Sequence, residues 1–145
     1  MTEKSELNEK LLQAVKNGSL ATVQTLLNQG ANPNAANDSG YSALMFASHC
    51  GYQEVVKLLL NKGSDINAKN SDGQTALMRA SEEGHLEIVK LLLNRGADAL
   101  LEDKNGKTAL HMACDRENID IEKLLVRDML ASAVEESMSM DFDVD

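Results

Sequence analysis

Three stretches of this sequence, GYSALMFA (residues 40–47), GQTALMRA (residues 73–80) and GKTALHMA (residues 106–113), begin 33 residues apart. Each has a first glycine, then a hydroxyl residue, Ala-Leu and a final alanine, whereas the residue after the glycine differs every time. Recurrence at a fixed spacing of this size indicates a repeat protein in which each unit is one supersecondary motif.

The third stretch also contains Gly-Lys-Thr, the end of the phosphate-binding loop G-x-x-x-x-G-K-[ST]. That loop needs a second glycine five residues before Gly106, but the residue there is Leu101, whose side chain would block the tight turn around phosphate. The residues ahead of Gly106 also make a poor strand. Because Lys107 fills a variable position of the repeat, the sequence does not favour a nucleotide site.

The same period runs through the rest of each unit. Aligned residues are Gly18, Gly51 and Gly84; Gly30, Gly63 and Gly96; Val23, Val56 and Val89; and Leu26, Leu59, Leu92 and Leu125. The hydroxyl residue predicts the N-cap of a short helix, and glycines such as Gly84 suit the turn that follows it. A second helix, apolar over most of its surface, is expected over residues 87–94, ended by Gly96. A polar stretch such as residues 63–73 then predicts an extended finger to the next unit.

The segments SALMFA, TALMRA and TALHMA resemble the ankyrin repeat, whose T-P-L-H-x-A signature opens a β-turn and two helices. Alanine stands in place of the signature proline, and only His111 keeps the histidine, which in the family makes a structural hydrogen bond. The resemblance implies an all-α solenoid of helix-turn-helix units linked by β-hairpin-like fingers. We expect one ankyrin-repeat domain over residues 1–127, with units at about 5–37, 38–70, 71–103 and 104–127.

The end units depart from the pattern. The first has a charged surface, as an end cap requires, and the last has Glu117 and Met129 in place of its two glycines. Residues 128–145 form an acidic tail that carries six acidic residues and no basic one. Apolar spacing predicts that this tail is partly helical, and we expect it to be disordered from Ser137.

The charge, the cysteines and the apolar runs of the sequence argue against several classes of protein. A net charge of −9 argues against nucleic acid as a partner, because phosphate neutralisation needs clustered Lys and Arg. The two cysteines occupy different repeat positions, which favours an intracellular, cytoplasmic protein without disulfides. The polar N-terminus does not resemble a signal peptide, and no apolar run approaches the roughly 20 residues of a membrane span. We expect a monomer.

No convergent chemical site is evident. His111 and Cys114 could share one helix face, but two ligands do not make a zinc site. The neighbouring carboxylates at residues 82–83 and at 135–136 would point different ways on a helix. The sequence therefore predicts no catalytic residues, no metal and no cofactor, and a protein that is not an enzyme.

The resemblance implies instead a protein partner on the concave face made by the fingers and the first helix of each unit. The variable positions there are Tyr41, Phe46, His49 and Cys50 in the second unit, Gln74, Arg79, Glu82 and Glu83 in the third, and Lys107, Met112, Asp115 and Arg116 in the fourth. Since aromatic residues and arginine dominate interface hot spots, our hypothesis is that Tyr41, Phe46 and Arg79 anchor the partner. The alternative is that Phe46 belongs partly to the core and Tyr41 covers the next finger.

Other functions stay open at this point. The chain could be a regulatory subunit or inhibitor that covers an enzyme's cleft, or a self-assembling scaffold joined through its tail or through Leu100 and Leu101. Those two leucines could equally pack against the C-terminal segment, which we favour. The acidic tail is most simply a solubilising end. It could also be a short linear motif, or an export signal loosely similar to those of bacterial ankyrin proteins delivered into host cells.

Overall fold

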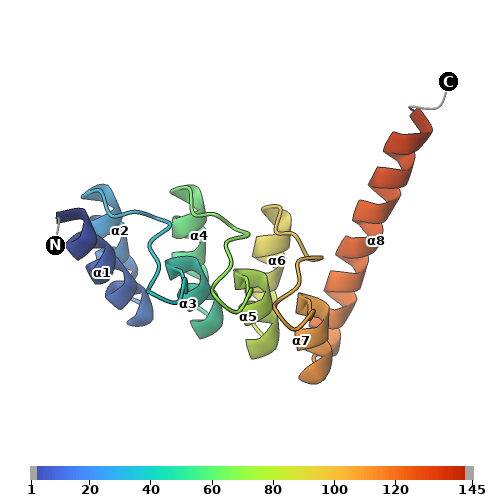
Figure 1. Ribbon diagram of the computed structural model, residues 1–145, viewed down its shortest axis with the longest axis horizontal. Coiled ribbons are helices and arrows are strands. Elements are labelled where there is room, and N and C mark those ends of the chain that lie inside the picture. Colours follow the sequence, from blue (N-terminus) through green and yellow to red (C-terminus); the bar gives the residue numbers. More distant parts are fainter. Residues whose placement is uncertain (1–2, 143–145) are drawn as a thin grey trace.

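The computed structural model describes residues 3–142 of the chain, and this part folds into a row of four helix pairs (Figure 1). The helices are α1 (Glu3–Lys16), α2 (Leu20–Asn28), α3 (Ala43–Cys50), α4 (Gln53–Asn61), α5 (Ala76–Glu83), α6 (Leu86–Asn94), α7 (Ala109–Asp115) and α8 (Ile119–Phe142). The expected all-α repeat solenoid is therefore confirmed.

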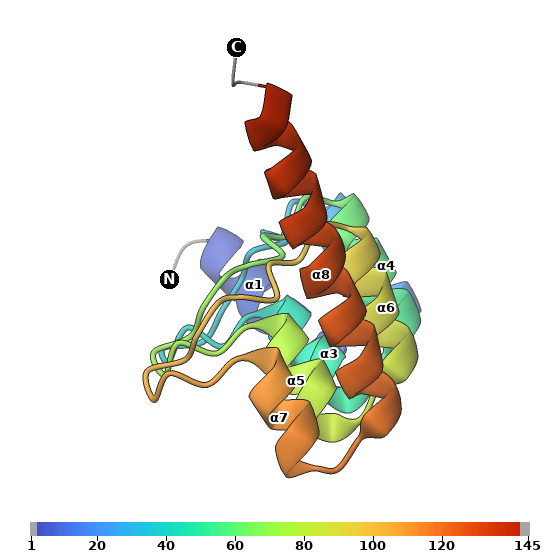
Figure 2. The same ribbon diagram turned by 90° about the vertical axis from the view of Figure 1, so that its right-hand side faces the viewer.

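The helices form two layers. The first helices of the units, α1, α3, α5 and α7, pack against one another in order, and so do the second helices, α2, α4, α6 and α8. The fingers project on the side of the first helices, as Figure 2 shows. The concave surface expected for partner binding therefore consists of the fingers and of α3, α5 and α7.

Side-chain caps and glycines set the limits of the short helices. The Ser42 hydroxyl accepts a hydrogen bond from the Met45 N–H at 3.2 Å, and the Thr75 hydroxyl accepts one from the Met78 N–H at 3.3 Å. At the other end, Gly51 and Gly84 adopt φ of 82° and 79°, which L residues rarely do. These caps and turns were predicted from the repeated residues.

The core runs through the whole row between the two layers. The aligned leucines Leu59, Leu92 and Leu125 are fully buried, as is Ile121, and Ile88 is nearly so. The alanine that closes each repeated stretch is also fully buried, at Ala47, Ala80 and Ala113. Because alanine is small, it lets neighbouring first helices approach closely, which explains why this position does not vary.

Each finger tip is a tight turn made by one Asx residue. The side chains of Asn37, Asn70 and Asp103 each accept backbone N–H groups two and four residues ahead. Neighbouring tips are also joined, since the Ser71 N–H donates to the Ser39 carbonyl at 2.8 Å and the Lys104 N–H to the Asp72 carbonyl at 3.0 Å. The fingers thus form one continuous ridge.

A side chain from each unit also lies over the interhelix glycine of the unit before it. Tyr52 covers Gly18 and His85 covers Gly51, so close that a Cβ at Gly51 would lie 2.7 Å from the His85 ring. His85 Nε2 donates to the His49 carbonyl at 2.9 Å. Residue 51 must therefore be glycine for two reasons: its positive φ, and the His85 ring that leaves no room for a Cβ.

The last unit ends differently from the expectation. With no glycine to stop it at residue 129, α8 continues to Phe142, whereas disorder was expected from Ser137. The expected domain boundary at residue 127 falls inside this helix. The segment contains no proline or glycine, and its residues favour or tolerate a helix. Residues 143–145 of the acidic tail lie outside the described part.

The two leucines of the last finger have separate environments. Leu101 packs against the core, whereas residue Leu100 is 62% exposed. Among the described residues, no helix combines the length and hydropathy needed to cross a bilayer.

Candidate functional site

An aromatic pair marks the concave face of the second unit. The rings of Tyr41 and Phe46 lie 4.4 Å apart with an interplanar angle of 58°. The Lys16 ammonium group, from the end of α1, lies 4.7 Å from the Phe46 ring centre, within the range of a cation–π interaction. Both residues are partly buried and pack against the core.

Arg79 on α5 joins this pair to the rest of the surface. Its Nε donates to the Tyr41 hydroxyl at 3.0 Å, and its Nη1 donates to the Glu82 carboxylate. Its side chain is only 15% exposed. The guanidinium therefore holds other side chains in place and presents little of itself to a partner.

His49 accepts a hydrogen bond in this arrangement. Its Nδ1 lies 2.7 Å from Arg79 Nη2 and 3.6 Å from a Glu83 oxygen. A guanidinium can only donate, so Nδ1 accepts from it and carries no proton of its own. The contact with Glu83 is then not an ion pair, and we assign the proton of the ring to Nε2.

The network continues into the last unit. Glu82 uses one oxygen for Arg79 and the other for Arg116 on the α7 side, whose Nη2 lies 3.5 Å away. Three units are thus connected by side chains: Tyr41 and His49 from the second, Arg79 and Glu82 from the third, Arg116 from the fourth.

Burial raises the pKa of the Tyr41 phenol, because a charged phenolate would be poorly solvated at this place. The Arg79 guanidinium acts in the opposite direction, through its charge and its hydrogen bond, but does not cancel the effect of burial. Tyr41 is therefore a neutral hydroxyl at physiological pH and accepts the bond from Arg79.

An open groove runs from this cluster to the finger tips. It is lined by the side chains of the cluster and by tip residues of two fingers, namely Ser39, Tyr41, Phe46, Ser71, Asp72, Gln74 and Arg79. The lining thus combines two aromatic rings with hydroxyl, amide and carboxylate groups. Such a surface suits a polypeptide that offers both apolar side chains and hydrogen-bonding groups.

Most positions proposed from the sequence lie together on this surface, but not all. Lys107 and Asp115 form a separate exposed pair, with Nζ and the carboxylate oxygen 3.3 Å apart. Met112 is only 8% exposed and belongs to the core, so it cannot be a contact residue in this conformation. The flexible, apolar side chain of methionine fills gaps in a core readily, and its burial there is favourable.

The sequence reasoning missed Lys16 and the finger-tip residues. Lys16 is one of the charged residues of the first unit, and only the three-dimensional structure shows that it lies over a ring of the next unit. For the tips a signal existed, since Asn37, Asn70 and Asp103 are 33 residues apart.

Comparison with known families agrees with this geometry. Residues 11–103 and 63–133 match the family described as ankyrin repeats (3 copies). The chain belongs to the ankyrin-repeat family. No curated protein matches it. Ankyrin repeats are protein–protein interaction modules, which makes the concave cluster the natural candidate site.

The ankyrin-repeat histidine keeps its structural hydrogen bond. His111 Nδ1 accepts from the Thr108 N–H at 3.1 Å, at the start of α7. Cys114, considered with it as a metal ligand, donates instead to Glu122 at 3.0 Å, and this hydrogen bond raises the pKa of the thiol. In the described part of the chain, no three His, Cys, Asp or Glu side chains are placed to hold a metal ion.

Proposed function

We propose that this ankyrin-repeat protein binds a partner protein on its concave surface, centred on Tyr41 and Phe46. The observation that supports this most is the Arg79 network, which holds Tyr41 and the neighbouring acidic residues in place before any partner arrives. A surface held in this way loses little conformational entropy on binding.

The composition of the surface indicates the kind of partner segment. Tyr41 and Phe46, which line the groove, would contact apolar side chains. The Glu82 and Glu83 carboxylates with Arg116 would form a charged rim. Hydrophobic centres with polar rims are usual in specific interfaces.

Both cysteines are free, which suits the reducing conditions inside a cell.

The proposal can be tested by affinity capture from a lysate of the cells that contain the protein, read by mass spectrometry. Phe46→Ala removes one ring, and Arg116→Glu reverses one charge of the rim. We expect each to lower the captured amount of the same protein by at least about tenfold, equivalent to about 1.4 kcal/mol.

Lys90→Glu is the matched control, because it reverses one exposed charge on the outer helix α6. It should leave capture unchanged. If Lys90→Glu lowers capture as much as Arg116→Glu does, or if Phe46→Ala has no effect, the partner does not bind the concave surface.

A further inference from the structure

The ring of His49 lies between a cation and an anion of the next unit. Its Nδ1 is 2.7 Å from Arg79 Nη2 and 3.6 Å from a Glu83 carboxylate oxygen, and that oxygen is 3.9 Å from the same Arg79 nitrogen. One ring nitrogen therefore faces both groups. Which of the two it bonds depends on whether it carries a proton.

A proton on Nδ1 would reverse the preference of the ring. Nδ1 then becomes a donor and the ring a cation, so the ring repels the guanidinium group 2.7 Å away. The Glu83 oxygen becomes the favourable partner, and its distance is within about 1 Å of the length of a charge-assisted hydrogen bond. Small rotations of the two side chains are enough to close this gap.

Arg79 would carry this exchange to the aromatic pair. Its Nε donates to the Tyr41 hydroxyl and its Nη1 donates to Glu82. Because the guanidinium group is planar and rigid, a movement of Nη2 away from His49 also moves these two nitrogens. Tyr41 lines the groove beside Phe46, so the shape of the groove depends on the bond that His49 makes.

The exchange involves few groups. Within residues 3–139, Arg79 and Glu83 are the charged side chains that the His49 ring contacts. The other titratable or charged groups of the surrounding elements have contacts elsewhere: Tyr41 and Glu82 with Arg79, Arg116 with Glu82, Glu54 with Lys57, Lys16 with Phe46, and the His85 ring with the His49 backbone carbonyl. Cys50, the next residue on α3, is an exposed thiol.

The ring can exchange protons with solvent while the fold stays closed, because the His49 side chain is 37% exposed and that of Glu83 is 36% exposed. Histidine is the side chain whose charge ordinarily changes between about pH 5 and 8. Carboxylate and guanidinium groups ordinarily keep their charge over this range.

We propose that protonation of His49 switches the concave surface: the ring exchanges Arg79 for Glu83, and the movement of Arg79 weakens its hold on Tyr41. The exchange is a property of the free chain. Its effect on binding rests on the partner docking at this groove, as proposed above. Because the protonated surface is less preorganised, we expect weaker binding below about pH 6.

The first test needs no partner. Heteronuclear NMR of the purified full chain follows the ring nitrogens of His49 and the Arg79 Nε–H group between about pH 8 and about pH 5.5. At the upper end Nδ1 should be unprotonated, and as the pH falls the Arg79 resonance should shift with the same midpoint as the His49 ring. An Arg79 resonance that stays constant while His49 titrates overturns the proposal, and so does a neutral ring with its proton on Nδ1.

His49→Asn is the decisive variant, because its amide oxygen can accept from Arg79 but does not titrate. It should abolish the pH-dependent shift of Arg79. His111→Asn is the matched control, since His111 bonds the Thr108 N–H at the start of α7, and it should keep the shift. Circular dichroism should show both variants folded. A shift that persists in His49→Asn, or that a folded His111→Asn loses, rules out His49 as its source.

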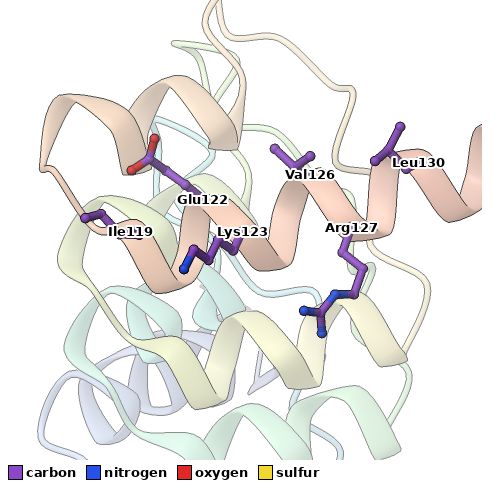
Figure 3. Close-up of a pocket in the computed structure, with 6 residues that line it drawn as sticks. All are labelled: Ile119, Glu122, Lys123, Val126, Arg127 and Leu130. Carbon is purple, nitrogen blue, oxygen red and sulfur yellow. The ribbon is translucent and has the colours of Figure 1, made fainter.

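Reference signals for this titration come from α8. Ile119 and Val126 line an open groove on that helix, beside Lys123 and Arg127 (Figure 3). The helices α5 and α7 stand between α3 and α8 in the row. The methyl resonances of Ile119 and Val126 should therefore not follow the His49 midpoint, and if they do, the pH change acts on the whole fold and the local exchange is wrong.

The second test repeats the partner capture at about pH 7.5 and about pH 5.5. The wild type should capture at least about fivefold less at the lower pH, whereas His49→Asn should capture similar amounts at both. A pH effect of equal size in His49→Asn, or none in the wild type, contradicts control of binding by His49. If Phe46→Ala leaves capture unchanged, the proposed docking surface is what fails, and the NMR titration decides the switch by itself.

Discussion

At the scale of the residue, Arg79 illustrates how one side chain organises a surface. It bonds Tyr41, Glu82 and His49 through three separate nitrogens, Nε, Nη1 and Nη2, which a planar guanidinium offers and the single nitrogen of a lysine does not. Sequence reasoning selected Arg79 as a partner contact. In the structure the Arg79 side chain is 15% exposed and holds its neighbours in place.

Tyr41 should ionise above the range of a free tyrosine. Burial raises its pKa, so its neutral form stabilises the fold below about pH 10, and this contribution is lost as the pH rises through the pKa of the folded protein. A Tyr52→Phe variant leaves Tyr41 as the one tyrosine, and its ultraviolet titration gives the midpoint. A midpoint at or below that of free tyrosine would contradict the buried phenol. Arg79→Gln should move the midpoint higher still.

Glycine at position 117 should make the fold more stable than the glutamate that is there. It adopts φ of 56°, the left-handed region, at the turn where the other units have glycine. Glu117→Gly should therefore raise the free energy of unfolding by about 0.5–1 kcal/mol, as measured by urea denaturation. Glu117→Ala keeps the strained backbone and should give no such gain; equal stabilisation by alanine would show that φ is not the cause.

At the scale of the element, adjacent units are joined by more than apolar packing. The side chain after each interhelix glycine covers the glycine of the preceding unit, as His85 covers Gly51. The sequence identified the interhelix glycines, but it could not show that His85 contacts Gly51, because the two residues are 34 positions apart.

Gly51→Ala and Gly63→Ala should separate the cost of a positive φ from the cost of a clash with a neighbouring side chain. Both residues have positive φ, of 82° and 97°, so alanine should cost each about 1 kcal/mol. A Cβ at Gly63 meets nothing within 4 Å, whereas one at Gly51 meets the His85 ring. Thermal unfolding should therefore show a clearly larger loss for Gly51→Ala. His85→Ala in that background should restore part of it, and equal losses at both glycines would rule out the steric effect.

At the scale of the whole molecule, stability comes from stacking, because no unit can bury its apolar face alone. The α6 helix contacts both α4 and α8, and its Leu92 is fully buried between the layers. A cavity at this place affects two unit interfaces at once.

Leu92→Ala should lower the free energy of unfolding by about 2–5 kcal/mol. Leu100→Ala, at an exposed finger residue, should change it by less than about 0.5 kcal/mol. Urea denaturation followed by circular dichroism checks both values. Similar effects from the two substitutions would mean that the buried Leu92 contributes no more to stability than an exposed leucine does.

The sequence by itself determined the repeat, its helix caps, its glycine turns and its buried leucines, because these depend on backbone geometry and on contacts that recur with a fixed period. Only the tertiary structure decided which side chains meet across units. Arg79 holds Tyr41, Lys16 lies over Phe46, and Met112 turns into the core, since such contacts depend on how neighbouring units stack. The sequence predicted a partly helical tail but not the full length of α8, because apolar and polar residues alternate after Ser137, whereas the helix continues to Phe142.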